Sequence, residues 1–379
     1  MAASTLDGGF PDVIGFDAAG SGADGSPDGF RPGGSVPLHD PLTAASKLDL
    51  LFLIDDSNSM APLQAKLRAR MPEFMTVLKN APGGMPDLQV AVVSSSLGAG
   101  IFGNVTGCAP GGPGNLEGAF QHKAGCGLHG GETFLKTSGG ANPMNNFDGD
   151  IASVFSCIAD LGQMGCGFES QLESVRLALQ KATVPGDPNY GFLRPDALLA
   201  VVFLTNEDDC SVAQNSMLFD PNQQSTSDPL GGLQSYRCTE FGHLCDQGLP
   251  HAAPMSPITL TNCQSREDGR LVRINDFINF LYSVKPMRPQ DLFVAVIGGP
   301  TAPYVVKSQT VPLASGVSEM QPVLAHSCTS GAAGTEYADP AVRLNQVAQA
   351  FVPNSVFASI CADDFSATVT NIAQQMVGR

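Results

Sequence analysis

The sequence has no tryptophan and few charged side chains, and those charges are mostly negative. Only 15% of the 379 residues are Asp, Glu, Lys or Arg, and 36 acidic residues against 20 Lys and Arg give a net charge of −16. Such a chain repels nucleic-acid phosphates and anionic lipid headgroups, so we expect neither as a partner. Hard cations and basic groups are the complementary ligands.

Membrane-spanning and signal segments are also missing from the sequence. No run of about 18 apolar residues occurs, which excludes an apolar transmembrane helix. The first residues, MAASTLDGGF, lack the basic and apolar regions of a signal peptide. If the protein is exported, we expect that its signal has been removed. A lipid anchor on the removed N-terminus is the membrane attachment that we consider for it.

Known catalytic motifs are absent as well. The chain contains no G-x-S-x-G, H-E-x-x-H or G-x-x-x-x-G-K, and its six histidines fall in no recognised nucleophile or metalloprotease pattern. We therefore predict that the protein is not an enzyme. A hydrolase that uses a metal-activated water as its nucleophile is the one enzymatic alternative that we keep.

Ten cysteines are spread over the chain after residue 107, without any C-x-x-C pair. This pattern favours disulfides and an oxidising compartment. We expect Cys157–Cys166 and Cys108–Cys126 as local pairs and Cys328–Cys361 as a longer one, with the remaining four pairing among themselves (Cys210, Cys238, Cys245 and Cys263), although spacing does not fix connectivity. The alternative is structural zinc, held by Cys126 and His129 with His122, or by Cys238, His243 and Cys245.

Two regions differ sharply in composition. Residues 1–46 are rich in Gly, Ala, Asp, Ser and Pro and carry too little apolar surface to offset the entropy of ordering, so we predict a flexible tether. From residue 47 onward, short apolar runs typical of strands buried on both faces alternate with helical patterns of period 3.6. The strand-like runs are 48–54, 88–93, 197–204, 292–297 and 356–360.

This alternation predicts an α/β fold, a doubly wound and mostly parallel sheet flanked by helices. We expect the helices at 63–78, 151–161, 172–179, 274–284, 341–351 and 365–377. Three long insertions, at about 97–148, 207–270 and 300–339, interrupt the pattern. Each follows the carboxyl end of a strand, where open α/β sheets bind ligands.

The chemistry-bearing motif follows the first strand. Asp55, Ser57 and Ser59 form an Asp-x-Ser-x-Ser whose oxygens can turn towards one point. An all-oxygen set suits Mg²⁺, Ca²⁺ or Mn²⁺. The alternative is that Asp55 and Ser57 only cap the next helix.

At KLDLLFLIDDSNSM the sequence resembles the von Willebrand factor type A (vWA) domain, whose metal-ion-dependent adhesion site begins with this motif. The resemblance covers residues 47–379 once the insertions are set aside. It implies two further metal loops. Glu169 stands where the family has Thr, and in LTNEDDC Asn206 stands where the family has Asp, with Asp208 as a joint candidate. The alternative for Glu169 is an acidic side chain in the first turn of a helix, stabilised by the helix dipole. The alternative for NEDD is a solvent-exposed acidic turn.

The resemblance implies a binding or adhesion module that holds a divalent cation and engages a protein or glycan. It extends to bacterial cell-surface vWA lipoproteins and adhesins, which implies an extracellular or cell-surface location, including the bacterial outer membrane. The alternative is a structural or scaffold protein of the envelope in which the metal only stabilises the fold.

Overall fold

The computed structural model describes residues 46–140 and 142–378. The predicted tether lies outside the described residues, apart from Ser46. Within the part that is described, no helix is both long and apolar enough to span a bilayer.

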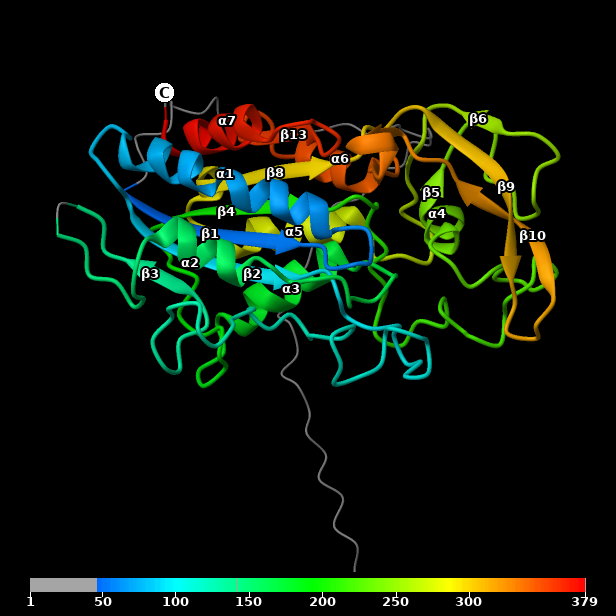
Figure 1. Cartoon of the computed structure of the whole chain (residues 1–379), viewed down its shortest axis with the longest axis horizontal. Coiled ribbons are helices and arrows are strands. Elements are labelled where there is room, and N and C mark those ends of the chain that lie inside the picture. The colour runs from blue at the N-terminus through cyan, green and yellow to red at the C-terminus, as the bar shows by residue number, and fades with distance from the viewer. Residues whose placement is uncertain (1–45, 141, 379) are drawn as a thin grey trace, which may run out of the picture. The chain divides into compact units, whose positions relative to one another are not determined.

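In the described residues, six strands form the main sheet (Figure 1), and five of them are parallel. The edge strand β3 is antiparallel to β2. The spatial order is β13 (Ser355–Ser359), β8 (Leu292–Gly298), β4 (Leu198–Leu204), β1 (Lys47–Ile54), β2 (Asp87–Ser94) and β3 (Leu135–Thr137). This is the doubly wound order, in which the chain leaves β1 in both directions.

Helices cover both faces of the sheet because alternate side chains of each strand point to opposite faces. Leu50 and Phe52 of β1 join one apolar cluster, and Leu51 and Leu53 join the other. The first cluster includes α1 (Ala61–Lys79), α2 (Ile151–Ile158) and α7 (Ser366–Val377), and the second includes α3 (Gln171–Lys181), α5 (Ile274–Val284) and α6 (Val342–Gln349). Each fully buried leucine contributes about 1.5–3 kcal/mol to these cores. The predicted fold class is confirmed.

The insertions contain the structure that apolar periodicity did not predict. The first holds β3, and the second holds α4 (Tyr236–Gly242), β5 (His243–Leu244), β6 (Ile258–Leu260) and β7 (Gln264–Ser265). The third holds β9 (Tyr304–Pro312), β10 (Ser318–Leu324), β11 (Cys328–Ser330) and β12 (Glu336–Ala338). Strand β6 pairs with β9, so the second and third insertions form one small sheet. Figure 1 shows α4, β9 and β10 beyond the carboxyl ends of β1 and β8.

All ten cysteines lie in the described residues and form five disulfides. Cys328–Cys361 is confirmed, as is pairing within the group of four, which forms Cys210–Cys238 and Cys245–Cys263. The two local pairs were wrong, because the structure joins Cys108 to Cys166 and Cys126 to Cys157. The zinc alternative is wrong too, since its cysteines have no thiolate to offer a metal.

Candidate metal site

The candidate site lies where two loops leave neighbouring strands of the sheet. Strands β1 and β4 are adjacent and parallel, so the loops that follow them begin side by side. The backbone N–H of Asp55 donates to the carbonyl of Leu204 over 3.0 Å, which joins the two loops at their first residues. The strand order reverses between β1 and β4, and open α/β sheets bind ligands at that point.

Asp55 is the buried centre of this region, with no exposed surface. Its Oδ1 accepts from the backbone N–H of Ser57 at 2.8 Å, and its Oδ2 accepts from the Thr205 hydroxyl at 2.7 Å. Burial raises the pKa of Asp55 despite these hydrogen bonds. No Lys, Arg or His in the described residues forms an ion pair with Asp55, so an ionised Asp55 lacks a counter-charge.

The two serines of the motif flank Asp55 differently. The Ser57 hydroxyl is buried and has no hydrogen-bond partner. Ser59 is half-buried, and the Asn206 amide nitrogen donates to its hydroxyl over 2.9 Å. An unpartnered buried hydroxyl costs about 1–3 kcal/mol, which a metal ion at this position would remove. Ser59 and Asn206 thus join the loop after β1 to the loop after β4, and Ser57 contacts Asp55 through its backbone N–H.

Asp56 supports the loop from behind. Its Oδ1 accepts from the hydroxyls of Ser94 and Ser96 at 2.7 and 2.9 Å, and its carbonyl accepts from Gly165 N–H at 2.8 Å. Burial is the main cause that raises the pKa of Asp56 to about 6. A Cβ on Gly165 would lie 2.5 Å from Asp56 Oδ1 and 2.7 Å from Ser96 Oγ, so only glycine fits against this carboxylate.

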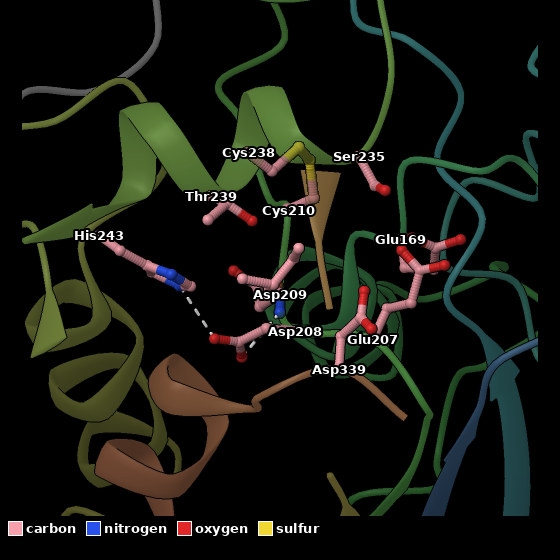
Figure 2. A pocket seen from close by; sticks show the side chains of 11 residues that line it. Glu169, Glu207, Asp208, Asp209, Cys210, Ser235, Cys238, Thr239, His243 and Asp339 are labelled. Atoms are coloured by element: carbon pink, nitrogen blue, oxygen red, sulfur yellow. Dashed lines mark hydrogen bonds and ion pairs between the residues drawn. A yellow bond between two sulfur atoms is a disulfide. The ribbon is translucent and has the colours of Figure 1, made fainter. Parts of the chain in front are cut away.

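Glu169 comes from the loop before α3 and is 1% exposed. Its Oε1 has no hydrogen-bond partner. Figure 2 shows its side chain beside that of Glu207, which follows β4. Burial is the largest cause that raises the pKa of both carboxyls, and repulsion between nearby carboxylates adds to it, taking Glu207 to about 8. Both shifts favour the protonated form of these carboxyls.

Asp208 is directed elsewhere. Its two oxygens accept from the backbone N–H groups of Arg343 and Leu344 at 2.8 and 3.1 Å, which caps the start of α6. Its Oδ2 also lies 3.0 Å from His243 Nε2, the contact that Figure 2 marks. Both oxygens are engaged, so the structure does not bring Asp208 into the group around Asp55.

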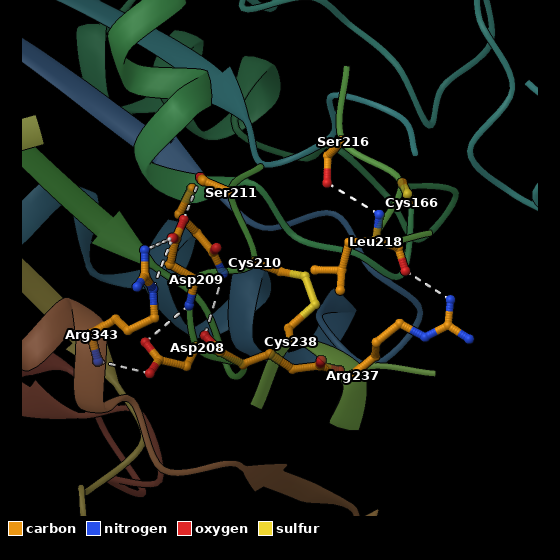
Figure 3. Close-up of a disulfide and its surroundings, with 12 residues drawn as sticks. Cys166, Asp208, Asp209, Cys210, Ser211, Ser216, Leu218, Arg237, Cys238 and Arg343 are labelled. Carbon is orange, nitrogen blue, oxygen red and sulfur yellow. Dashed lines mark hydrogen bonds and ion pairs between the residues drawn. A yellow bond between two sulfur atoms is a disulfide. The ribbon is translucent and has the colours of Figure 1, made fainter. Parts of the chain in front are cut away.

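The next residues anchor the loop after β4 (Figure 3). Asp209 and Arg343 are both fully buried and form an ion pair of 3.0 Å, and Asp209 also accepts from the N–H of Leu172 at the start of α3. The Cys210–Cys238 disulfide then ties the loop to α4. This loop is thus fixed to α3, α4 and α6.

The donor chemistry can be tested against the expected divalent cation. In the described residues, no group of three or more His, Cys, Asp or Glu side chains is arranged to hold a metal ion. The set at this site differs because it combines carboxylates (Asp55, Glu169) with hydroxyl and amide oxygens (Ser57, Ser59, Asn206). Hard cations accept such mixed oxygen ligands. The unpartnered Ser57 hydroxyl is the feature that fits the ion.

Two acidic side chains of the site region were not predicted as site residues. Glu207 stands between two predicted candidates, and its position in the NEDD run was the available signal. Asp339 lies in the third insertion, and its N–H donates to the Asn206 carbonyl over 2.8 Å. No pattern along the chain indicates that contact, because it joins the end of the third insertion to a residue 133 positions earlier, just after β4.

Comparison with known proteins returns little. No protein-family model matches the chain, and no curated relative matches it. Among solved structures it is similar to the vWF domain of the type V pili tip protein Mfa5 from Porphyromonas gingivalis. The identity is 12%, the match covers 89% of this chain and 98% of that one, and the TM-score is 0.34. At these values the similarity carries no functional argument, and the fold is defined by the strand order of the chain itself.

Proposed function

We propose that the protein is a binding or adhesion module that holds one divalent cation and uses it to engage an acidic group of a protein or glycan partner. Asp55, Ser57, Ser59 and Asn206 would hold the ion, with Glu169 beside them. The ion would supply a positive charge beside buried carboxylates. The supporting observation is the buried, partnerless Ser57 hydroxyl next to the buried Asp55 carboxylate.

The proposed location is extracellular or at the cell surface. Five disulfides support it, because such bonds persist in oxidising compartments. Two of them, Cys108–Cys166 and Cys210–Cys238, tie down loops next to the site, which favours a preformed site.

Accessibility of the site favours adhesion over a metal that only stabilises the fold. Asn58 is exposed and Ser59 half-buried, so one side of the motif borders solvent. A partner carboxylate could reach the ion from that side. The crowding of Glu169 and Glu207 supports the scaffold alternative, since extra carboxylates could fill the coordination sphere.

A count of exchangeable waters separates these two functions. The protein is loaded with Mn²⁺, and the relaxation of water protons is measured before and after acetate is added. The adhesive function predicts at least one exchangeable water on the ion, displaced by acetate, and no bound Mn²⁺ in Asp55→Asn. Bound Mn²⁺ without exchangeable water would establish the scaffold alternative instead.

A further inference from the structure

A small, partly enclosed cavity lies beside the proposed metal position, between the loop after β4 and α4. Figure 2 looks into it. Its lining includes Glu169, Glu207, Asp339, Thr239, Leu324 and the Cys210–Cys238 disulfide. Figure 2 shows the three carboxylates grouped together, with the disulfide and Thr239 apart from them. Its enclosed part has room for a single water-sized group.

One atom in this wall indicates a missing ligand. Glu169 is 1% exposed, lines the cavity, and its Oε1 has no partner. A buried carboxylate oxygen without a donor is costly, more so than a neutral group. Other acids of the cavity are already satisfied, because Asp208 contacts His243 and Asp209 pairs with Arg343.

The charge balance also leaves a cation missing. Asp55, Glu169, Glu207 and Asp339 together carry four negative charges when ionised. Among the ion pairs of the described residues, none joins a Lys or Arg to any of the four, and Asp339 contacts His326 Nδ1 at 2.7 Å. A divalent ion at Asp55 would neutralise two charges and leave the cavity side uncompensated.

We propose that this cavity binds a primary ammonium group, the side chain of a lysine that the partner presents next to its metal-binding acid. The ammonium donates to Glu169, Glu207 and the Thr239 hydroxyl. Its methylene stem lies against Leu324 and the disulfide, in the way that lysine stems cover apolar surface.

An ammonium fits this cavity better than a second metal ion does. Its size is close to that of water, which is what the enclosed part accommodates. A bare divalent ion needs a tight group of oxygen ligands on several sides, whereas one wall here is apolar. No group of three or more His, Cys, Asp or Glu side chains in the described part of the chain has metal-binding geometry. The guanidinium of arginine is wider than the enclosed space.

This inference rests on the proposed adhesive function, because the lysine and the metal-bound acid belong to one partner. It adds a requirement for that partner, which must carry both an acidic and a basic side chain within a few ångströms of each other. The protein would then discriminate against partners that carry only the acid.

The probe is n-butylammonium, with 1-butanol as its uncharged counterpart, titrated calorimetrically into the full chain with and without Mg²⁺ at pH 7.5. Variants Glu207→Gln and Thr239→Val test the cavity, and Asp268→Asn, whose side chain is 81% exposed, is the matched control. We expect butylammonium to bind wild type and the control, and to bind Glu207→Gln at least about tenfold more weakly. Thr239→Val should show a smaller loss of about threefold.

Binding of butylammonium no tighter than butanol would overturn the inference, as would unchanged affinity in both cavity variants. A second Mg²⁺ per chain that is lost in Glu207→Gln and excludes the amine would also overturn it, since the cavity would then be a metal site. Amine binding by a protein that binds no Mg²⁺ would support the ammonium site and refute the proposed metal-dependent function. Mg²⁺ binding without amine binding would support the metal site and refute the ammonium site.

Discussion

Asp55 and Thr205 lie 150 positions apart, yet the Thr205 hydroxyl donates to Asp55 Oδ2 over 2.7 Å. Asp55 directly follows β1 and Thr205 directly follows β4, so the hydrogen bond joins the two loops at the point where the strand order reverses. Because the sheet fixes both strand ends, the buried carboxylate is held in place before any ligand arrives. Preorganisation of this kind lowers the cost of binding.

Replacing Gly165 should disturb the site from behind. In Gly165→Ala the new Cβ would lie 2.5 Å from Asp56 Oδ1, so Asp56 or the loop must move. We expect a loss of about 1–3 kcal/mol in the free energy of unfolding, measured by urea denaturation, and weaker Mg²⁺ binding by calorimetry.

Gly167 is the matched control, since it lies on the other side of Cys166 and an added Cβ there meets nothing within 4 Å. Gly167→Ala should leave both measurements near wild type. Equal effects of the two substitutions would show that the Asp56 contact does not support the site.

Metal-free protein should lose stability as pH rises. The folded pKa of Glu207 is about 8 and its ordinary value is 4.5, so between these values the unfolded chain binds fewer protons than the folded chain. The free energy of unfolding therefore falls with increasing pH across that window. We expect the thermal midpoint in chelator to be several degrees lower at pH 8 than at pH 5.5.

Two comparisons check the origin of this pH dependence. Glu207→Gln should make it shallower, although the raised pKa values of Asp56 and Glu169 leave part of it in place. Mg²⁺ should raise the midpoint more at pH 8 than at pH 5.5. Asp268→Asn should retain the wild-type profile. A wild-type midpoint that increases steadily from pH 5.5 to 8 in chelator would contradict the assignment.

The Asp209–Arg343 pair should be worth far more than an exposed pair. Arg343→Met leaves Asp209 buried and uncompensated, which should cost about 3–5 kcal/mol in the free energy of unfolding. Arg273→Met breaks an exposed pair with Asp276 and should cost less than about 1 kcal/mol.

Adding Asp209→Asn to Arg343→Met should recover part of the loss, because the stranded charge is removed. Denaturant titration of the four variants measures the coupling. Strict additivity of the two substitutions would mean that the pair does not act as a unit.

Two disulfides should differ in their effect on metal binding. Replacing both cysteines of Cys108–Cys166, 58 residues apart, should cost about 4 kcal/mol, and replacing those of Cys245–Cys263, 18 apart, about 3 kcal/mol. The Cys166 N–H donates to Ser96 Oγ, which in turn donates to Asp56, so only the first removal should weaken Mg²⁺ affinity in calorimetry. Equal weakening in both variants would indicate a general effect of stability.

The main sheet was predictable because a strand that is buried on both faces is a nearly continuous run of apolar residues. Runs such as LDLLFLI cannot be placed at a surface, and β1, β2, β4, β8 and β13 were each expected to within two residues of their observed ends. Strand β3 was missed because three residues at an edge carry no apolar periodicity. The small sheet formed by β6, β9 and β10 was missed for a similar reason, since its exposed side chains alternate weakly.

Of the proposed site residues, those that closely follow a buried strand are the ones whose position at this edge of the sheet could be predicted from the sequence. Asp55 and Asn206 do so, and a hydrogen bond from Thr205 brings their loops together. The direction in which Asp208 points could not be predicted, because it depends on the start of α6 more than 130 positions later. Glu207 lines the cavity, whereas Asp208 and Asp209 bind the starts of α6 and α3.

The most direct test of the central claim is the affinity for Mg²⁺ of the wild-type protein and Asp55→Asn, measured by isothermal titration calorimetry with Asp268→Asn as control. Asparagine retains the shape of the side chain and removes its charge. We predict one site per chain in wild type and control, and at least about a hundredfold weaker binding in Asp55→Asn, since a buried carboxylate ligand is lost. Equal affinities in all three proteins would contradict the account.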